Sequence, residues 1–170
     1  MIKITNRTYY FFLFFICHEL IIAAYYFELY IGLDPCPLCM ISRAVVMMLG
    51  GSFFLAAIHD PKNMMRKMYH IVFSLISLLG ILVSGRHIYL QSLPADEVPS
   101  CGPGLEYMLD TLPLSDVLKE VLHGSGECAE VSWQFLSLSM PEWLIIIYSG
   151  FLVLSIIPVF ERKKNLRFSD

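Results

Sequence analysis

Four long apolar blocks limit the fold of this chain more than any other feature of its sequence. They cover residues 9–33, 40–58, 69–90 and 143–160, and 56% of the 170 residues are hydrophobic. A helix rises about 1.5 Å per residue, so roughly 20 residues cross the ~30 Å hydrocarbon core of a membrane. We therefore expect an all-α membrane protein, with a single domain over residues 1–170 built as a four-transmembrane-helix bundle.

Two alternative interpretations of these blocks fit the sequence less well. A soluble helical bundle would need a polar face recurring every third or fourth residue, and the blocks have none. A cleaved signal peptide would have a shorter apolar core followed by a small-x-small cleavage site, which does not follow residue 33. We expect the first block to be retained as a membrane span.

The basic residues predict how the spans are oriented. Lysine and arginine concentrate in cytoplasmic loops of membrane proteins. Nine of the twelve basic residues fall on one predicted side: Lys3, Arg7, Lys62, Arg66, Lys67, Arg162, Lys163, Lys164 and Arg167. Both termini are therefore expected in the cytoplasm. The turn at 33–35 and the loop at 91–142, which carries nine acidic residues, are expected on the outer side.

The long outer loop is predicted to contain one short amphipathic helix. The stretch LPLSDVLKEVLHG, residues 112–124, places Leu114, Val117 and Leu118 on one helical face and Asp116 and Lys119 on the other. A helix tethered between two spans is expected to lie flat on the bilayer surface. The alternative is a helix packed against the rest of the loop.

The cysteines follow the same topology. Cys36, Cys39, Cys101 and Cys128 fall on the outer side, and Cys17 lies within the first span. Four cysteines in an oxidising compartment suggest two disulfides. Cys36-Pro-Leu-Cys39 reads as a helix start, with Cys36 as the cap and the proline in the first helical position. The positive end of a helix favours the thiolate, the reactive form of cysteine.

Cationic residues are predicted at the same membrane level as this dithiol. Arg43 lies one helical turn beyond Cys39, and its charge needs a partner such as a thiolate or a bound oxygen ligand. Arg86 and His87 stand at the outer end of the third span. Together these residues could line one pocket. The alternatives are arginines that extend to lipid head groups and an interfacial histidine with ordinary hydrogen bonds.

Two other uses of the cysteines fit the sequence less well. Zinc sites made only of cysteine usually show two closely spaced pairs, whereas Cys101 and Cys128 stand 27 positions apart, from 101 to 128. We therefore expect no metal. Two static disulfides could brace the outer loops, but they would not require an arginine directed at the dithiol.

With these motifs in place, the chain resembles the DsbB family, the disulfide bond formation protein B of bacterial inner membranes. The resemblance rests on four spans, on PCPLC with Arg43 after it, and on a cysteine pair in the second outer loop. The most specific match is SGECAE…W…L…MPEWL, residues 125–144. It covers nearly the whole chain. The route from DsbA through DsbB to quinone keeps the bacterial periplasm oxidising.

The resemblance implies a role for each site residue. Cys101 and Cys128 would form the disulfide that reoxidises a periplasmic DsbA-like thioredoxin-fold partner. Cys36 and Cys39 would form the disulfide beside a quinone, either ubiquinone or menaquinone, with Cys39 touching the ring. Arg43 and His87 would complete the quinone site. The protein would then be a multi-pass enzyme of the cell inner membrane, with no nucleic-acid partner.

Three other functions remain open at this point. A tetraspanin-like adaptor would have a disulfide-braced outer loop, usually with Cys-Cys-Gly, where this chain has a single Cys101 before Gly102. A vitamin K epoxide reductase-like enzyme has its C-x-x-C after the loop cysteines, the reverse of the order here. A DsbB paralogue could serve a dedicated partner.

Overall fold

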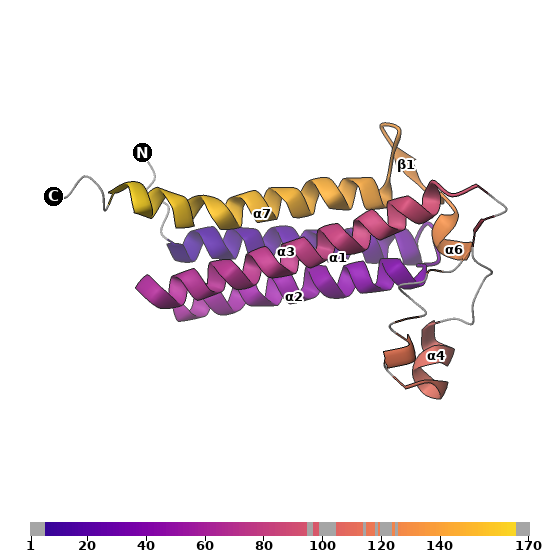
Figure 1. The fold of residues 1–170 in the computed structure, drawn as a ribbon, viewed down its shortest axis with the longest axis horizontal. Helices are drawn as coiled ribbons and strands as arrows, with labels where there is room; N and C mark the ends of the chain where they lie inside the picture. Colours follow the sequence, from indigo (N-terminus) through magenta and orange to yellow (C-terminus); the bar gives the residue numbers. More distant parts are fainter. Residues whose placement is uncertain are drawn as a thin grey trace.

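The computed structural model describes residues 6–94, 97–98, 105–113, 115–117, 119, 124 and 126–165. Four of its helices are long and apolar enough to cross a membrane, which confirms the predicted fold class. Figure 1 shows them side by side along one axis. Their bounds are Asn6–Leu29 for α1, Pro37–His59 for α2, Asn63–Gln91 for α3 and Met140–Asn165 for α7.

The helix bounds differ from the apolar blocks for local reasons. Helix α1 ends at Leu29, before the end of its block, and Gly32 with a φ of 74° reverses the chain. Glycine takes this left-handed conformation without steric cost. Helix α3 begins at Asn63, ahead of the apolar block, because a polar first turn can extend beyond the hydrocarbon without breaking the helix.

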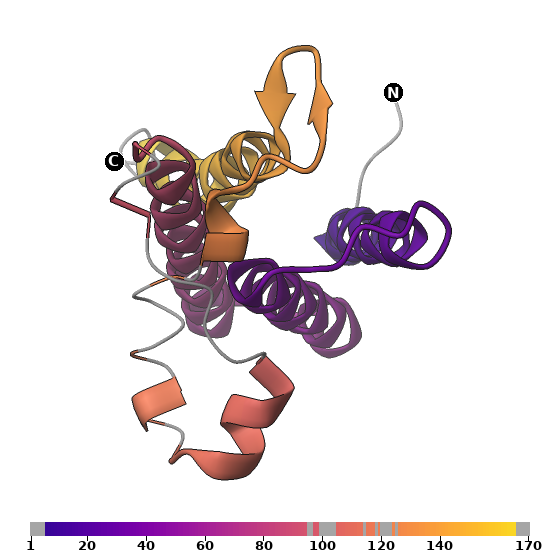
Figure 2. The same cartoon turned by 90° about the vertical axis from the view of Figure 1, so that its right-hand side faces the viewer.

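The helices pack in an open series, and this order positions the site. Contacts join α1 to α2, α2 to α3, and α3 to α7. The view along the bundle in Figure 2 shows the four helices arranged around the bundle in this order, so that α7 comes round toward α1. Between α1 and α7, the Tyr9 hydroxyl donates a hydrogen bond to the Leu154 carbonyl at 3.2 Å.

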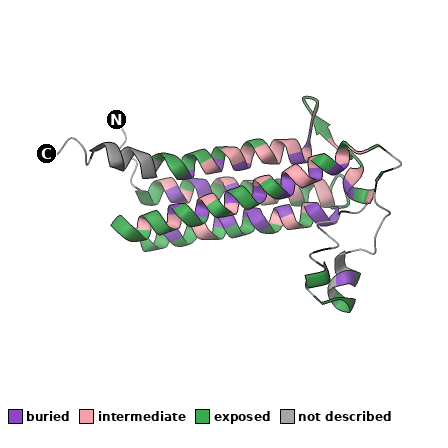
Figure 3. Cartoon of the chain, in the orientation of Figure 1, coloured by how far each residue is buried: buried purple, intermediate pink, exposed green. Residues whose placement is uncertain are grey.

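The core of the bundle is aromatic and lies toward the end where α1 begins. Tyr10, Phe53, Phe73 and Tyr148 are each no more than 1% exposed and belong to one buried cluster. Phe53 and Phe73 bring α2 and α3 together, with ring centroids 4.5 Å apart. Figure 3 shows the buried residues facing between the helices and the exposed ones facing outward, as expected where lipid covers an apolar surface.

The segment between α3 and α7 contains short elements at one end of the bundle. These are α4, Leu105–Thr111; α6, Gly126–Ala129; and a hairpin of β1, Gln134–Phe135, and β2, Leu138–Ser139. The hairpin was not predicted. Its turn places Leu136 and Ser137 at φ values of 52° and 65°, positions normally taken by Asn and Gly, so the sequence lacks the usual hairpin signal.

The predicted amphipathic helix lies only partly within the described residues. Residues 115–117 and 119 are helical, whereas Leu114, Leu118 and residues 120–123 lie outside the described residues. Val117 is buried in a cluster that also contains Met108 of α4. This burial favours packing within the loop at that residue, and contact of the helix with the bilayer surface stays a prediction.

Helix α7 begins with a capping box. Ser139 precedes the helix, and its backbone N–H donates to the Glu142 carboxylate at 2.5 Å. A Ser-x-x-Glu sequence satisfies an otherwise unpaired donor at a helix start. The cap therefore fixes the residue at which the fourth span begins.

The packing of α3 against α7 depends on Gly80. A Cβ at this residue would lie 2.5 Å from the Tyr148 ring, whereas a Cβ at Gly85 of the same helix would meet no atom within 4 Å. We expect Gly80→Ala to lower the free energy of unfolding by about 1–3 kcal/mol, the usual cost of overpacking. Gly85→Ala should be neutral or stabilising by up to about 1 kcal/mol. Unfolding in detergent measures both, and equal effects would contradict this account.

Candidate active site

The start of α2 holds the cysteine pair. Cys36 caps the helix in an extended conformation, and its Sγ accepts the Cys39 backbone N–H at 3.4 Å. Pro37 occupies the first helical position. The predicted cap and helix start are both confirmed. A Cys-Pro-x-Cys sequence folds this way because proline needs no hydrogen bond in the first turn and its fixed φ suits a helix.

The two sulfur atoms are in direct contact. The Cys36 Sγ lies 3.0 Å from the Cys39 Sγ, in hydrogen-bond geometry, so the structure represents the dithiol state. Cys36 is buried, and Cys39 is half-buried. Because the sulfur atoms are already neighbours, little backbone movement is needed to join them. The Cys36–Cys39 disulfide itself stays a prediction.

His87 and Cys128 complete the cluster. The His87 Nε2 of α3 lies 3.8 Å from the Cys36 Sγ. Cys128 of α6 is fully buried in the same cluster as Cys36. Hydrogen bonding with Cys128, then with Cys39, and burial raise the pKa of the Cys36 thiol above its ordinary value. Cys36 therefore stays protonated at neutral pH.

The structure places three of the four predicted redox cysteines together. Cys36, Cys39 and Cys128 meet at the end of the bundle where α2 begins, although Cys128 is far away in the sequence. Cys101 lies outside the described residues, so the predicted Cys101–Cys128 disulfide stays a prediction. Cys17, in α1, is buried within the aromatic core next to Gly50 and takes no part in this cluster.

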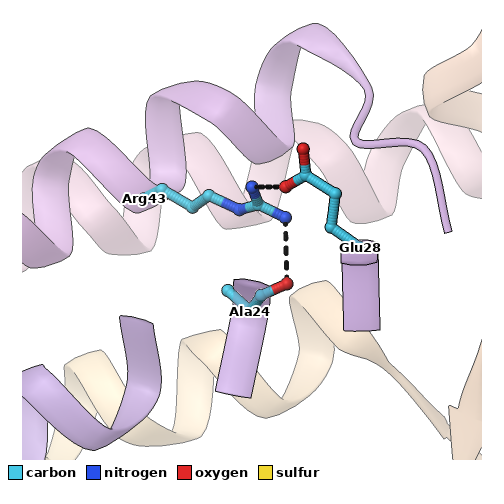
Figure 4. Close-up of polar contacts among 3 residues, drawn as sticks. All are labelled: Ala24, Glu28 and Arg43. Carbon is cyan, nitrogen blue, oxygen red and sulfur yellow. Dashed lines mark hydrogen bonds and ion pairs between the residues drawn. The ribbon is translucent and has the colours of Figure 1, made fainter. Parts of the chain in front are cut away.

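Arg43 has a partner that the sequence reasoning missed. Its guanidinium forms an ion pair with Glu28 in the last turn of α1, donates to the Ala24 carbonyl at 3.2 Å, and lies 5.3 Å from the Tyr25 ring centroid. Figure 4 shows the side chain directed across to α1. An acidic residue in the last turn of a membrane span was the available signal, because such a charge needs a partner.

Arg86, the other cation considered, is arranged differently. Its guanidinium lies 5.1 Å from the Tyr89 ring centroid on the same helix. Among the described residues that line the large cavity at this end, both Arg43 and His87 appear and Arg86 does not. The predicted grouping of Arg43 and His87 with the dithiol is therefore seen in the structure, while their binding role stays a prediction.

The cavity has a volume of about 710 Å³ and is bounded by α1, α2 and α7, with the end of α3 and the segment from α6 to β1 closing its outer end. Its walls are largely apolar, with Leu20 and Phe27 from α1 and Ile147 from α7. Cys36, Cys39, Arg43 and His87 supply polar groups in the wall. Ligand sites in proteins commonly measure about 300–1,000 Å³ and combine apolar walls with a few polar groups.

Aromatic side chains close one edge of this cavity. Phe27 contacts Trp133 with centroids 5.1 Å apart, and Trp133 stacks on Phe135 at 6.1 Å. The Trp143 indole N–H donates to the Phe135 carbonyl at 3.2 Å. The hairpin, which was not predicted, therefore links α1 to the start of α7 at this edge of the cavity.

The Glu28–Arg43 pair should matter for stability as well as for the site. Glu28→Gln leaves a largely buried guanidinium without its anion, and losing such a partner costs about 1–3 kcal/mol. Glu19→Gln, on the same helix, removes a carboxylate whose side chain is 72% exposed on the outer surface of a membrane span, where a charge is unfavourable, so it should not lower the stability. Unfolding in detergent compares them. If Glu28→Gln proved as harmless as Glu19→Gln, the pair would not hold α1 against α2.

Comparison with known proteins identifies the family. The profile described as "Disulfide bond formation protein DsbB" matches residues 6–158. A disulfide bond formation protein B of Nitrosococcus oceani is 45% identical over 159 residues, which are 94% of this chain and 92% of that protein. One from Hahella chejuensis is 47% identical over 148 residues, 87% of this chain and 90% of the relative. The predicted resemblance is confirmed, and the chain belongs to the DsbB family of disulfide bond formation proteins.

Proposed function

We propose that the protein reoxidises a periplasmic DsbA-like thiol oxidase and passes the electrons to a membrane quinone. The observation that carries this proposal is a C-x-x-C dithiol in the wall of a largely apolar cavity, which lies within the membrane-spanning bundle. Membership of a disulfide-forming family supports an oxidoreductase and disfavours the tetraspanin-like and vitamin K epoxide reductase-like alternatives.

The chemistry of the cavity suits a quinone. Apolar walls fit a flat ring with an isoprenoid tail, and Arg43 and His87 offer polar contacts to ring oxygens. A quinone bound there would accept two electrons and two protons from the Cys36–Cys39 dithiol, leaving the disulfide. We expect Cys39, which is half-buried and lines the cavity, to be the thiol that touches it. Ubiquinone and menaquinone share this chemistry, so we propose the class and not the species.

The neighbouring Cys128 supports the other half of the route. In the proposed sequence, a partner thiolate attacks Cys101 of the Cys101–Cys128 disulfide and releases the Cys128 thiolate. Cys128 then attacks Cys36, which breaks the Cys36–Cys39 bond and releases Cys39. The partner's second cysteine attacks the partner sulfur bonded to Cys101, so the oxidised partner leaves and Cys101 is released. Cys101 attacks Cys128, which re-forms the Cys101–Cys128 disulfide and leaves Cys36 and Cys39 as the dithiol that reduces the quinone. Each step exchanges one sulfur–sulfur bond for another, as thiol–disulfide exchange requires. The contact of Cys128 with Cys36 is the arrangement that the second exchange needs.

The route also requires a defined orientation in the membrane. We propose an inner-membrane protein with the cysteine loops in the periplasm and both termini in the cytoplasm, as the distribution of basic residues predicts. The α4, α6 and hairpin elements lie at one end of the bundle in Figure 1, while α1 begins at the opposite end. Cys36 at the start of α2 and Cys128 in α6 belong to the end that carries these elements. The partner would therefore approach the end that carries the cysteines.

The first test concerns the quinone. Purified protein stripped of quinone should lose turnover with its partner and regain it when ubiquinone or menaquinone is added. Arg43→Ala should raise the apparent KM for quinone about 10-fold or more, because hydrogen bonds to a charged group contribute about 1.5–3 kcal/mol. Arg86→Ala is the matched control and should leave it unchanged. Full turnover without any added acceptor would contradict the proposal, as would equal effects of the two arginine variants.

The second test concerns the order of exchange. With its loop disulfide formed, the unchanged protein should accumulate a covalent complex between Cys101 and the first cysteine of the partner's C-x-x-C, because this partner lacks the second cysteine that would release it. The partner's second cysteine is removed for the experiment, and non-reducing gels with mass spectrometry identify the linkage. Cys101→Ala should form no such complex. A complex through Cys36, with turnover persisting when both loop cysteines are absent, would make the loop pair structural.

A further inference from the structure

We propose that the reduced protein binds one Zn²⁺ through Cys36, Cys39 and His87, and that the ion holds the dithiol in its reduced state. This inference goes beyond electron transfer to quinone. It needs only the reduced cysteine pair, so it can succeed or fail independently of the proposed acceptor and partner.

The three ligand atoms are already grouped. The Cys36 Sγ, the Cys39 Sγ and a His87 ring nitrogen all lie within 4.8 Å of one another. Zinc binds thiolate sulfur at about 2.3 Å in a tetrahedron, which places two sulfur ligands about 3.8 Å apart. The sulfur atoms, now 3.0 Å apart, would separate by less than about 1 Å, and the 3.8 Å between Cys36 Sγ and His87 Nε2 already suits two ligands of one ion.

The His87 ring is oriented as metal-binding histidines are. Its Nε2 faces Cys36, and the ring also hydrogen-bonds with the Cys128 backbone, which leaves the Nδ1 for that bond. A histidine that donates one ring N–H to a backbone carbonyl presents the lone pair of its other nitrogen to a metal. The same α6 segment thus orients His87 and brings the Cys128 thiol against Cys36.

The spacing of the cysteines concealed this possibility. A site made only of cysteine is disfavoured because Cys101 and Cys128 are far apart in the sequence. The structure instead adds a histidine that is 51 positions from Cys36 to the Cys36–Cys39 pair. Thiolate and imidazole ligands in a tetrahedral set are the combination that zinc favours.

The binding step involves protons but no electrons. Each coordinating thiol releases its proton as the Zn–S bond forms, and no sulfur is oxidised. A Cys36–Cys39 disulfide has no thiolate to offer, so only the reduced state would bind. Zinc would thereby compete with formation of this disulfide and slow the return of the protein to its oxidised state.

Cobalt, which occupies zinc sites and is coloured, provides a readout independent of turnover. Fully reduced protein in detergent, titrated with Co²⁺ under argon, should give a thiolate-to-cobalt charge-transfer band and the visible bands of tetrahedral cobalt at one equivalent. Added Zn²⁺ should abolish these bands. Protein with its disulfides formed should show neither. Identical spectra for reduced and oxidised protein, or no thiolate band in the reduced protein, would overturn the proposal.

Variants then test the ligands. Cys39→Ser and His87→Gln should each weaken Zn²⁺ binding by at least about 10-fold, since losing even one outer contact of a metal site costs 10–100-fold. Cys17→Ser, which removes a buried cysteine from the aromatic core, should bind as the unchanged protein does. If His87→Gln bound zinc with unchanged affinity, the dithiol alone would be the site and the proposal would be wrong. Cys39→Ser carries the test should His87→Gln fail to fold.

Discussion

The bilayer requires that backbone N–H and C=O groups within it be bonded inside the chain, and the rest of the structure depends on this constraint. Each span meets it by forming one long helix, so irregular chain is confined to the ends of the bundle. At the end where α2 begins, the helix start and the α6 turn bring three sulfur atoms together, and the hairpin lines the cavity beside them. Reactive groups gather there because that is where the backbone is free to present them.

Much of this arrangement could be predicted from the sequence, because the constraint acts on composition. Block length and the absence of polar faces predicted four spans, and the order Cys-Pro-x-Cys predicted the capped start of α2. The position of Cys128 beside Cys36 could not be derived from spacing, since it depends on how a long loop folds back over the bundle. The hairpin was missed because its turn uses leucine and serine at positive φ without the residues that usually mark such turns.

The Glu28–Arg43 pair could not be predicted when each span was considered separately. A carboxylate at the end of α1 and a guanidinium in α2 are each unfavourable near hydrocarbon, and together they neutralise one another across the helix interface. Arg43 is therefore held by α1 before any ligand is present, with a fixed direction at the edge of the cavity (Figure 4). If Arg43 binds a ligand oxygen as we propose, its side chain would need little reorganisation, and such preorganisation lowers the entropic cost of binding.

The open series of helices would affect how a lipid-soluble ligand reaches the cavity. Helix α1 packs along α2 rather than along α7, and residues of both α1 and α7 line the cavity, so within a bilayer the cavity would face acyl chains as well as water. A lipid-soluble molecule would then enter by lateral diffusion within the bilayer, where its local concentration is far higher than in the aqueous phase. Occupancy would follow its mole fraction among the lipids. The makeup of the surrounding membrane would in this way set how often the cavity is filled.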